Sequence, residues 1–202
     1  MKEHTVDTKH SNYIEDKILV IEAKSNPDKY DCLFNKYLKP LVRYCALYVD
    51  WEDAKDIAQD TLLRGLMELP RIDPDNSFRG WIYRVAHNLC IDHIRKNKRE
   101  RNTSIEAEFL QETYYDSTQF QKMKDTFSAL FKCISLLLVK EQEVVKLRMN
   151  NLTLTEISYV IRLSISGVKK RLDNALEKLK DCLCNKGIKR LCQNDQLKQP
   201  AT

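Results

Sequence analysis

Residues 151–180, NLTLTEISYVIRLSISGVKKRLDNALEKLK, contain the strongest local structural signal of the sequence. Thr153 is followed by Glu156 at the spacing of a capping box, in which each side chain satisfies an otherwise unpaired amide at the start of a helix. Apolar residues then recur every three or four positions on both sides of a break at residues 162–164. The stretch therefore predicts two short helices joined by a three-residue turn, with Ser164 capping the second helix.

The second of these helices has a basic outer face. Residues 164–180 contain five bases and two acids, and Lys169, Lys170 and Arg171 fall in the N-terminal half. Two short helices, a tight turn and a basic second helix are typical of the helix-turn-helix that reads duplex DNA. We therefore predict DNA binding through the second helix. The alternative is an amphipathic helix whose polar face is merely solvated.

The rest of the chain also has helical periodicity. Of its 202 residues 43% are hydrophobic, which is enough for a core, and only 4 glycines and 5 prolines are available for the turns of a β-fold. Apolar spacing predicts helices over 28–49, 51–69 and 78–99, with Pro40 kinking or restarting the first and Ser77 capping the third. The pattern fades over 102–121 and resumes at Met123. We expect an all-α protein with two small helical domains joined by a flexible linker.

Several functional classes are disfavoured by composition and motifs. No apolar run reaches the length of a membrane span, and the first 17 residues lack the apolar segment of a secretory signal, so we expect a cytoplasmic protein. The seven cysteines then read as free thiols. We find no nucleophile paired with a base and no complete metal motif, so we expect no enzymatic activity and no cofactor. Only Cys182, Cys184 and Cys192 form a weak candidate metal site.

Charges of opposite sign are segregated in the first half of the chain. Residues 50–60 hold five acids and one lysine, whereas residues 95–101 hold five bases and one acid. Phe78 and Trp81 precede the basic run, and aromatic rings beside bases suit unstacked nucleic-acid bases. The alternative is that both rings belong to the core. Because one phosphate-binding surface would not retain the acidic run, we predict two different partners.

Two segments in this order resemble one family. Residues 53–99, DAKDIAQDTLLRGLMELPRIDPDNSFRGWIYRVAHNLCIDHIRKNKR, closely resemble region 2 of bacterial RNA polymerase sigma factors of the extracytoplasmic-function (ECF) class, in the sigma-70 superfamily. Residues 141–180, beginning EQEVVKLRMN, look like their region 4. The resemblance implies a region 2 domain over 10–101, a linker over 102–121, a region 4 helix-turn-helix domain over 122–182 and a tail over 183–202.

The resemblance also implies partners and residue roles. Such a factor binds core RNA polymerase, opens promoter DNA at the −10 element and reads the −35 element as duplex, and an anti-sigma factor is expected. By correspondence, polymerase contacts fall on Asp53, Asp56, Gln59, Asp60 and Arg64. Contacts to the −10 element fall on Ile72, Asn76, Phe78, Trp81, Arg84, Asn88, Arg95, Lys96 and Arg99. Contacts to the −35 element fall on Ser164, Ser166, Lys169, Lys170, Arg171 and Asn174.

The chain departs from the family pattern at two points, and two other functions compete. Arg162 stands where the family turn has a glycine, and Leu138 and Val139 stand where a Pro-Pro pair is common. One competing function is a helix-turn-helix transcriptional regulator that acts without polymerase. The other is an all-helical adaptor that uses its acidic helix for protein partners only.

Overall fold

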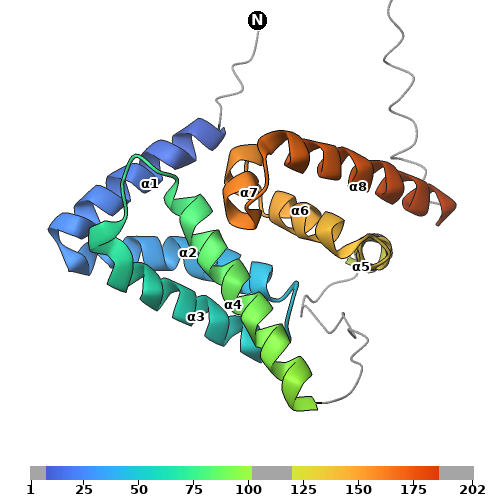
Figure 1. Ribbon diagram of the computed structural model, residues 1–202, viewed down its shortest axis with the longest axis horizontal. Helices are drawn as coiled ribbons and strands as arrows, with labels where there is room; N and C mark the ends of the chain where they lie inside the picture. The colour runs from blue at the N-terminus through green and yellow to red at the C-terminus, as the bar shows by residue number, and fades with distance from the viewer. Residues whose placement is uncertain (1–7, 102–119, 187–202) are drawn as a thin grey trace, which may run out of the picture. The chain divides into compact units, whose positions relative to one another are not determined.

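The computed structural model describes residues 8–101 and 120–186, with side chains placed over 13–99 and 128–186. Every regular element in these ranges is a helix (Figure 1). The predicted all-α fold is therefore confirmed. Over the same residues, none of the helices combines the length and apolar character of a membrane span. The expected linker lies almost entirely outside the described residues.

The described helices group into two compact units. The first unit takes in Met1–Gln111 and Asn150–Arg162, and the second takes in Glu112–Met149 and Leu163–Thr202. The first therefore contains helices α1 to α4 together with α7 (Leu154–Ile161), whereas the second contains α5, α6 and α8. The domain boundaries expected from the sequence, with a linker over 102–121, stay a prediction.

The first unit is built around a core shared by its first four α-helices. Their bounds, with two short 3-10 helices, are α1 (Thr8–Ser25), η1 (Pro27–Lys29), α2 (Tyr30–Cys45), α3 (Trp51–Glu68), η2 (Leu69–Arg71) and α4 (Phe78–Arg101). Helix α2 packs on α3, and α4 contacts α1, α2 and α3. Fully buried side chains from three of these helices, among them Leu33, Leu62 and Ile82, fill the space between them.

Helix α2 runs from Tyr30 to Cys45 through Pro40. Of the two outcomes expected at this proline, a kink or a restart, the restart is therefore wrong. A proline inside a helix costs about 3 kcal/mol because it lacks an amide hydrogen. Leu41, Tyr44 and Cys45, which follow it, are completely buried, and burying one large apolar side chain stabilises by about 1.5–3 kcal/mol. Burial beyond the proline therefore outweighs the lost hydrogen bond.

The second unit consists of α5 (Phe120–Ser135), α6 (Val139–Met149) and α8 (Ile165–Asn185). Helix α8 buries Val168, Leu172, Ala175 and Leu179, and packs on both α5 and α6. A salt bridge of 2.7 Å between Lys178 Nζ and Glu141 Oε1 joins α8 to α6. The side chain of Glu141 also accepts a hydrogen bond of 3.1 Å from the backbone N–H of Leu138, which fixes the start of α6.

A disulfide between Cys133 and Cys182 links α5 to α8, with their Cα atoms 5.9 Å apart. The expectation that all seven cysteines are free thiols is therefore wrong for this pair, and Cys184 is disulfide-bonded as well. Sequence spacing gave no sign of the first bond, because the two cysteines are 49 residues apart and meet only in the folded unit. Cys45 and Cys90 are buried and form no disulfide, as expected.

Candidate functional site

The outer face of α3 carries the predicted polymerase contacts. Asp50 caps the helix by accepting a hydrogen bond of 3.0 Å from the backbone N–H of Asp53. Asp56, Gln59 and Asp60 are exposed, and so is Arg64 one turn further on. The opposite face is buried, including Ala54 and Leu62. The sequence thus places Asp53 in the first turn of the helix, where the helix dipole favours negative charge, and places Asp56 and Asp60 on the exposed face.

Asp53 differs from the other acids of this face because it has a partner within the unit. Its Oδ2 lies 2.8 Å from Nε2 of His93 on α4, and both side chains are partly buried. His87, the other histidine of α4, is buried and shares a hydrogen bond of 3.0 Å with the hydroxyl of Tyr44. Both histidines are therefore held by protein groups of the same unit.

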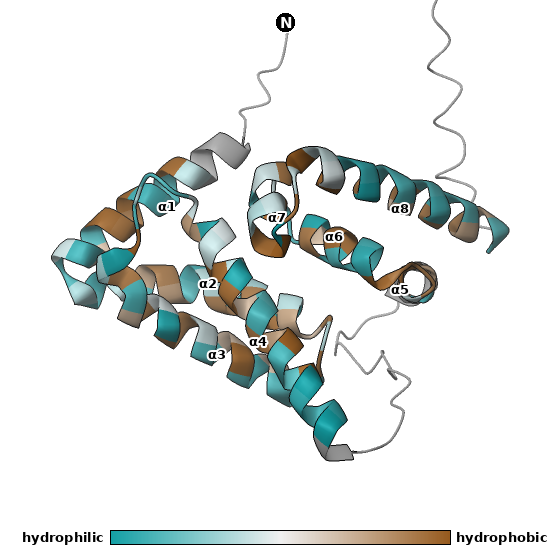
Figure 2. Cartoon of the chain, in the orientation of Figure 1, coloured by the Kyte–Doolittle hydropathy of each residue, from teal (hydrophilic) through white to brown (hydrophobic). Residues whose placement is uncertain are grey.

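The C-terminal half of α4 presents the predicted basic surface. Arg95, Lys96 and Arg99 are exposed, and this part of the helix is almost wholly hydrophilic (Figure 2). Asn88 is exposed one to two turns earlier on the same helix. Arg84 lies nearer the start, where its guanidinium carbon sits 4.6 Å from the centre of the Tyr159 ring of α7.

The structure separates the predicted aromatic residues into a core ring and an outer ring. Phe78 is only 2% exposed and makes an edge contact with Tyr37. Trp81 is partly exposed and stacks on Phe78 with 6.1 Å between the ring centroids. Ile72 is also buried. Phe78 and Ile72 are therefore core residues, as the alternative expected for Phe78, and Trp81 is the more accessible of the two rings. A contact of Trp81 with the −10 element stays a prediction.

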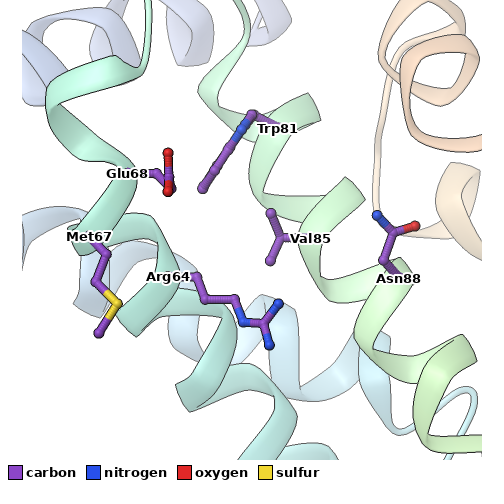
Figure 3. Close-up of a pocket in the computed structure, with 6 residues that line it drawn as sticks. All are labelled: Arg64, Met67, Glu68, Trp81, Val85 and Asn88. Carbon is purple, nitrogen blue, oxygen red and sulfur yellow. The ribbon is translucent and has the colours of Figure 1, made fainter.

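An open pocket of about 400 Å³ lies between α3 and α4 (Figure 3). It brings Arg64, a predicted polymerase contact, together with Trp81 and Asn88, which were predicted to bind the −10 element. The indole of Trp81 and the carboxylate of Glu68 face each other there. Sequence reasoning missed three lining residues, Met67, Glu68 and Val85. Met67 is 76% exposed, and an apolar side chain on the outer face of an acidic helix was the available signal.

A second pocket of about 380 Å³ adjoins the loop between η2 and α4. Ile72, Asn76 and Trp81 line it on one side, and Tyr159 of α7 is among the residues on the other. The loop is well ordered by its own hydrogen bonds, since Ser77 Oγ accepts the backbone N–H of Gly80 at 3.0 Å and the amide of Asn76 donates to Asp73 at 3.1 Å. The predicted role of Ser77 as the cap of α4 is confirmed.

The predicted helix-turn-helix is confirmed in its local geometry. Helix α7 (Leu154–Ile161) begins with both hydrogen bonds of the capping box between Thr153 and Glu156. Arg162 then adopts the left-handed conformation, with φ 53° and ψ 50°, at the position where the family pattern has glycine. Ser164 caps α8 by accepting the backbone N–H of Gly167 at 3.2 Å. The turn therefore keeps its geometry despite the arginine.

The predicted −35 contacts share one helix and its cap. Most of these predicted contacts are exposed, namely Ser164, Ser166, Lys169, Lys170 and Asn174. Arg171 is partly buried. Gly167 lies among them, and a Cβ there would stand 2.9 Å from the side chain of Leu163. Glycine at this position thus lets the turn pack closely on the first turn of α8.

The weak metal candidates do not come together as a site in the described residues. No cluster of three or more potential ligands occurs within the placed parts of the chain. Cys182 is bonded to Cys133 and is not a thiolate in this form, and Cys192 lies outside the described residues.

Comparison with known proteins identifies the family. The family model described as Sigma-70 region 2 matches residues 33–100, which span most of α2 to α4. The RNA polymerase sigma factor YlaC of Bacillus subtilis is 30% identical over 158 residues, covering 76% of this chain and 91% of that protein. The ECF RNA polymerase sigma factor SigM of the same species is 24% identical over 161 residues, covering 78% of this chain and 96% of that one.

Solved structures show the same fold. One is CnrH in complex with the cytosolic domain of CnrY, with a TM-score of 0.62 and 23% identity, covering 84% of this chain and 97% of that one. Another is RpoE from Bartonella quintana in complex with the anti-sigma factor NepR, with a TM-score of 0.61 and 18% identity, covering 76% and 96%. The segregated acidic and basic helices, the helix-turn-helix and these similarities lead to one conclusion: the chain belongs to the RNA polymerase sigma factors of the ECF class.

Proposed function

We propose that this sigma factor divides promoter recognition between a region 2 domain over 10–101 and a region 4 domain over 122–182. The outer face of α3 binds core RNA polymerase, the pocket beside α4 holds the opened −10 element, and α8 reads the −35 duplex. The observation that carries this proposal is the pocket between an acidic helix and a basic helix, because Arg64, a predicted polymerase contact, lines it together with Trp81 and Asn88, two predicted contacts of the −10 element.

Polymerase binding is supported by the exposed charges of α3. Asp56 and Asp60 lie on one exposed face and have no described partner in the unit comparable to the one His93 provides for Asp53. Complementary charge steers association and rejects wrong partners, and fully reversed charges cost several kcal/mol at an interface. A basic surface of the polymerase is therefore the partner that this face fits.

Binding of the −10 element is supported by the chemistry around Trp81. Extruding a base from the duplex costs a few kcal/mol of free energy because its stacking is lost. Stacking of that base on an aromatic side chain stabilises it by about 1–3 kcal/mol. Trp81 supplies the ring, the exposed amide of Asn88 supplies a base-edge contact, and Arg95 and Arg99 supply phosphate contacts further along α4. The nearby carboxylate of Glu68 favours a base with a donor group.

Reading of the −35 element is supported by the exposed cap and first turns of α8. Side chains at the start of a recognition helix reach base edges, and lysines beside them contact phosphates. Ser164 and Ser166 stand at this start, followed by Lys169 and Lys170. We no longer favour the two competing functions, a transcriptional regulator that acts without polymerase and an all-helical adaptor. Membership of the sigma factor family explains the acidic helix and the helix-turn-helix together.

We also propose an anti-sigma factor as a regulator of this chain and the cytoplasm as its location. The structures of CnrH and RpoE were both solved as complexes, the second with a protein named as an anti-sigma factor. A protein of that class is therefore the regulator that we propose for this chain. Because core polymerase and chromosomal DNA lie in the bacterial cytoplasm, we propose the same compartment here. Nothing in the proposed mechanism requires covalent catalysis.

Permanganate reactivity tests the assignment of the pocket. Holoenzyme is assembled from core polymerase and the full chain, and thymines that become reactive near the −10 element report strand opening. Trp81→Ala should lower their reactivity about fivefold or more, because one stacking contact is lost. Trp51→Ala is the matched control, since Trp51 is the other tryptophan and is 47% exposed at the start of α3. Equal reactivity in both variants would remove Trp81 from the mechanism.

A further inference from the structure

We propose that Cys133 and Cys182 form a reversible redox switch that governs −35 binding. In the oxidised form the disulfide fixes α8 on α5, and in the reduced form α8 is held less firmly and binds DNA more weakly. This inference rests on the proposed role of α8 in reading the −35 element.

The disulfide attaches α5 to α8 at a buried position of α5. Among the placed side chains of this helix, residues 128–135, only Cys133 and Ile134 are buried. The bond joins Cys133 to the last turns of α8, three residues before that helix ends at Asn185. The salt bridge between Glu141 and Lys178 supports α8 from α6 instead, and the side chain of Lys178 is 50% exposed. Cleavage of the disulfide therefore removes the covalent link that orients α8 on α5.

The setting of the bond favours reversibility. Stable disulfides are rare in reducing compartments, and those that occur in cytoplasmic proteins are usually transient or redox-sensing. Cys182 is partly exposed near the end of its helix, whereas Cys133 is 1% exposed. Thiol–disulfide exchange requires access of an attacking thiolate to one sulfur. Cys182 offers that access, and the buried Cys133 remains close enough to close the bond again.

The chemistry needs a peroxide as oxidant and a dithiol as reductant. The Cys182 thiol releases its proton, and the thiolate attacks one oxygen of hydrogen peroxide so that the O–O bond breaks. The sulfur becomes a sulfenic acid, and the hydroxide that leaves takes up the released proton and departs as the first water. Cys133 then attacks that sulfur, the S–S bond forms, the S–O bond breaks, and its thiol proton leaves in a second water. A dithiol reverses the process through a mixed disulfide with Cys182; both cysteines regain protons, and the reductant leaves as a disulfide.

The test compares oxidised and reduced full-length protein. The protein is treated with hydrogen peroxide or with dithiothreitol, and peptide mass mapping then detects whether the Cys133–Cys182 disulfide is present. We expect the oxidised form to have a Tm about 5–15 °C higher. We also expect holoenzyme containing it to bind a −35 duplex, taken from mapped promoters, about fivefold or more tightly. Cys182→Ser should behave as the reduced form under both treatments.

Two further variants isolate the pair. Cys32→Ser, at an exposed free thiol of α2, and Cys184→Ser, which leaves the proposed pair intact, should both retain the redox response. Absence of the Cys133–Cys182 peptide after peroxide, or equal Tm and equal affinity in both forms, overturns the switch. If the Tm rises on oxidation but neither form binds the −35 duplex, the assignment of α8 to DNA fails, and with it the regulatory role of the bond.

Discussion

The carboxylate of Asp53 on α3 contacts the imidazole of His93 on α4, with 2.8 Å between Oδ2 and Nε2. The pair joins the acidic helix that we propose for polymerase to the basic helix that we propose for the −10 element. It also commits one of the predicted polymerase contacts to the fold. Asp56 and Asp60, both exposed, are then the charges that α3 offers to a partner.

Reversal of these two charges should weaken polymerase binding. Asp56→Lys combined with Asp60→Lys should lower the affinity for core polymerase at least about tenfold, because like charges then face each other across the interface. The Tm should change by only a few degrees, since both side chains are exposed. Fluorescence anisotropy of the labelled factor titrated with core polymerase measures the effect.

Glu22→Lys is the control for this variant, because it makes the same charge reversal as each of the two substitutions, at an exposed position of α1. It should bind core polymerase as the unmodified chain does. An equal loss of affinity in the control and in the double variant would show a general charge effect and contradict the role of α3.

Removal of either lysine at the start of α8 should change the salt dependence of DNA binding. Lys169→Ala and Lys170→Ala should each lower the slope of log K against log salt by about 1, because each phosphate contact releases about one counterion. Binding of holoenzyme to a −35 duplex is measured over a range of salt concentrations. Lys39→Ala, at an exposed position of α2, should leave the slope unchanged. An unchanged slope in the α8 variants would exclude these lysines as phosphate contacts.

Replacement of Arg162, the left-handed residue of the turn, by glycine should stabilise the protein. Arg162 has φ 53°, a conformation that costs a residue with a Cβ about 1 kcal/mol relative to glycine. Arg162→Gly should therefore raise the free energy of unfolding by up to about 1 kcal/mol, partly offset by the greater entropy of glycine in the unfolded chain. Urea denaturation measures the difference. A destabilised variant would mean that the arginine side chain makes a compensating interaction.

The link between α6 and α8 should depend on pH. The hydrogen bond from Lys178, together with one from the backbone N–H of Leu138, lowers the pKa of Glu141 below its ordinary value of 4.5. A lowered folded-state pKa stabilises the protein above the unfolded-state value, and this stabilisation disappears as the pH falls through the folded-state pKa. Glu141→Gln should therefore lower the Tm by about 2–5 °C at pH 7. The gap should close toward pH 3.

Glu177→Gln is the matched control for this pH effect, since Glu177 is exposed on the neighbouring turn of α8. Its Tm should follow that of the unmodified chain at both pH values. If the difference between Glu141→Gln and the unmodified chain stays constant from pH 7 to pH 3, the carboxylate does not act through its ionised form.

Local signals in the sequence predicted most of the fold. The capping box at Thr153 and the cap at Ser164 are confirmed because such hydrogen bonds depend only on neighbouring residues. The helix expected over 51–69 ends at Glu68, and the one expected from residue 78 begins at Phe78. Each of these elements carries its own start and stop residues.

Features that depend on distant residues were not predicted. Helix α1 went unrecognised because Ile14, Ile18 and Ile21 are about half exposed while Asp16, an acid, is buried. Asp16 is held by a salt bridge of 2.9 Å from Lys36 on α2, which only the folded unit provides. The disulfide was missed for the same reason. In the candidate site, Met67 and Glu68 join Trp81 across two helices, and no local pattern links them.

The central claim is that this chain makes core RNA polymerase start transcription at specific promoters. The direct measurement is transcription of fragmented genomic DNA from the source organism by core polymerase with and without the full-length protein, followed by mapping of the RNA 5′ ends. We predict a set of start sites that requires the protein and shares one −10 and one −35 element at fixed spacing. The same start sites with core polymerase alone, or protein-dependent starts without a shared element, would contradict the account.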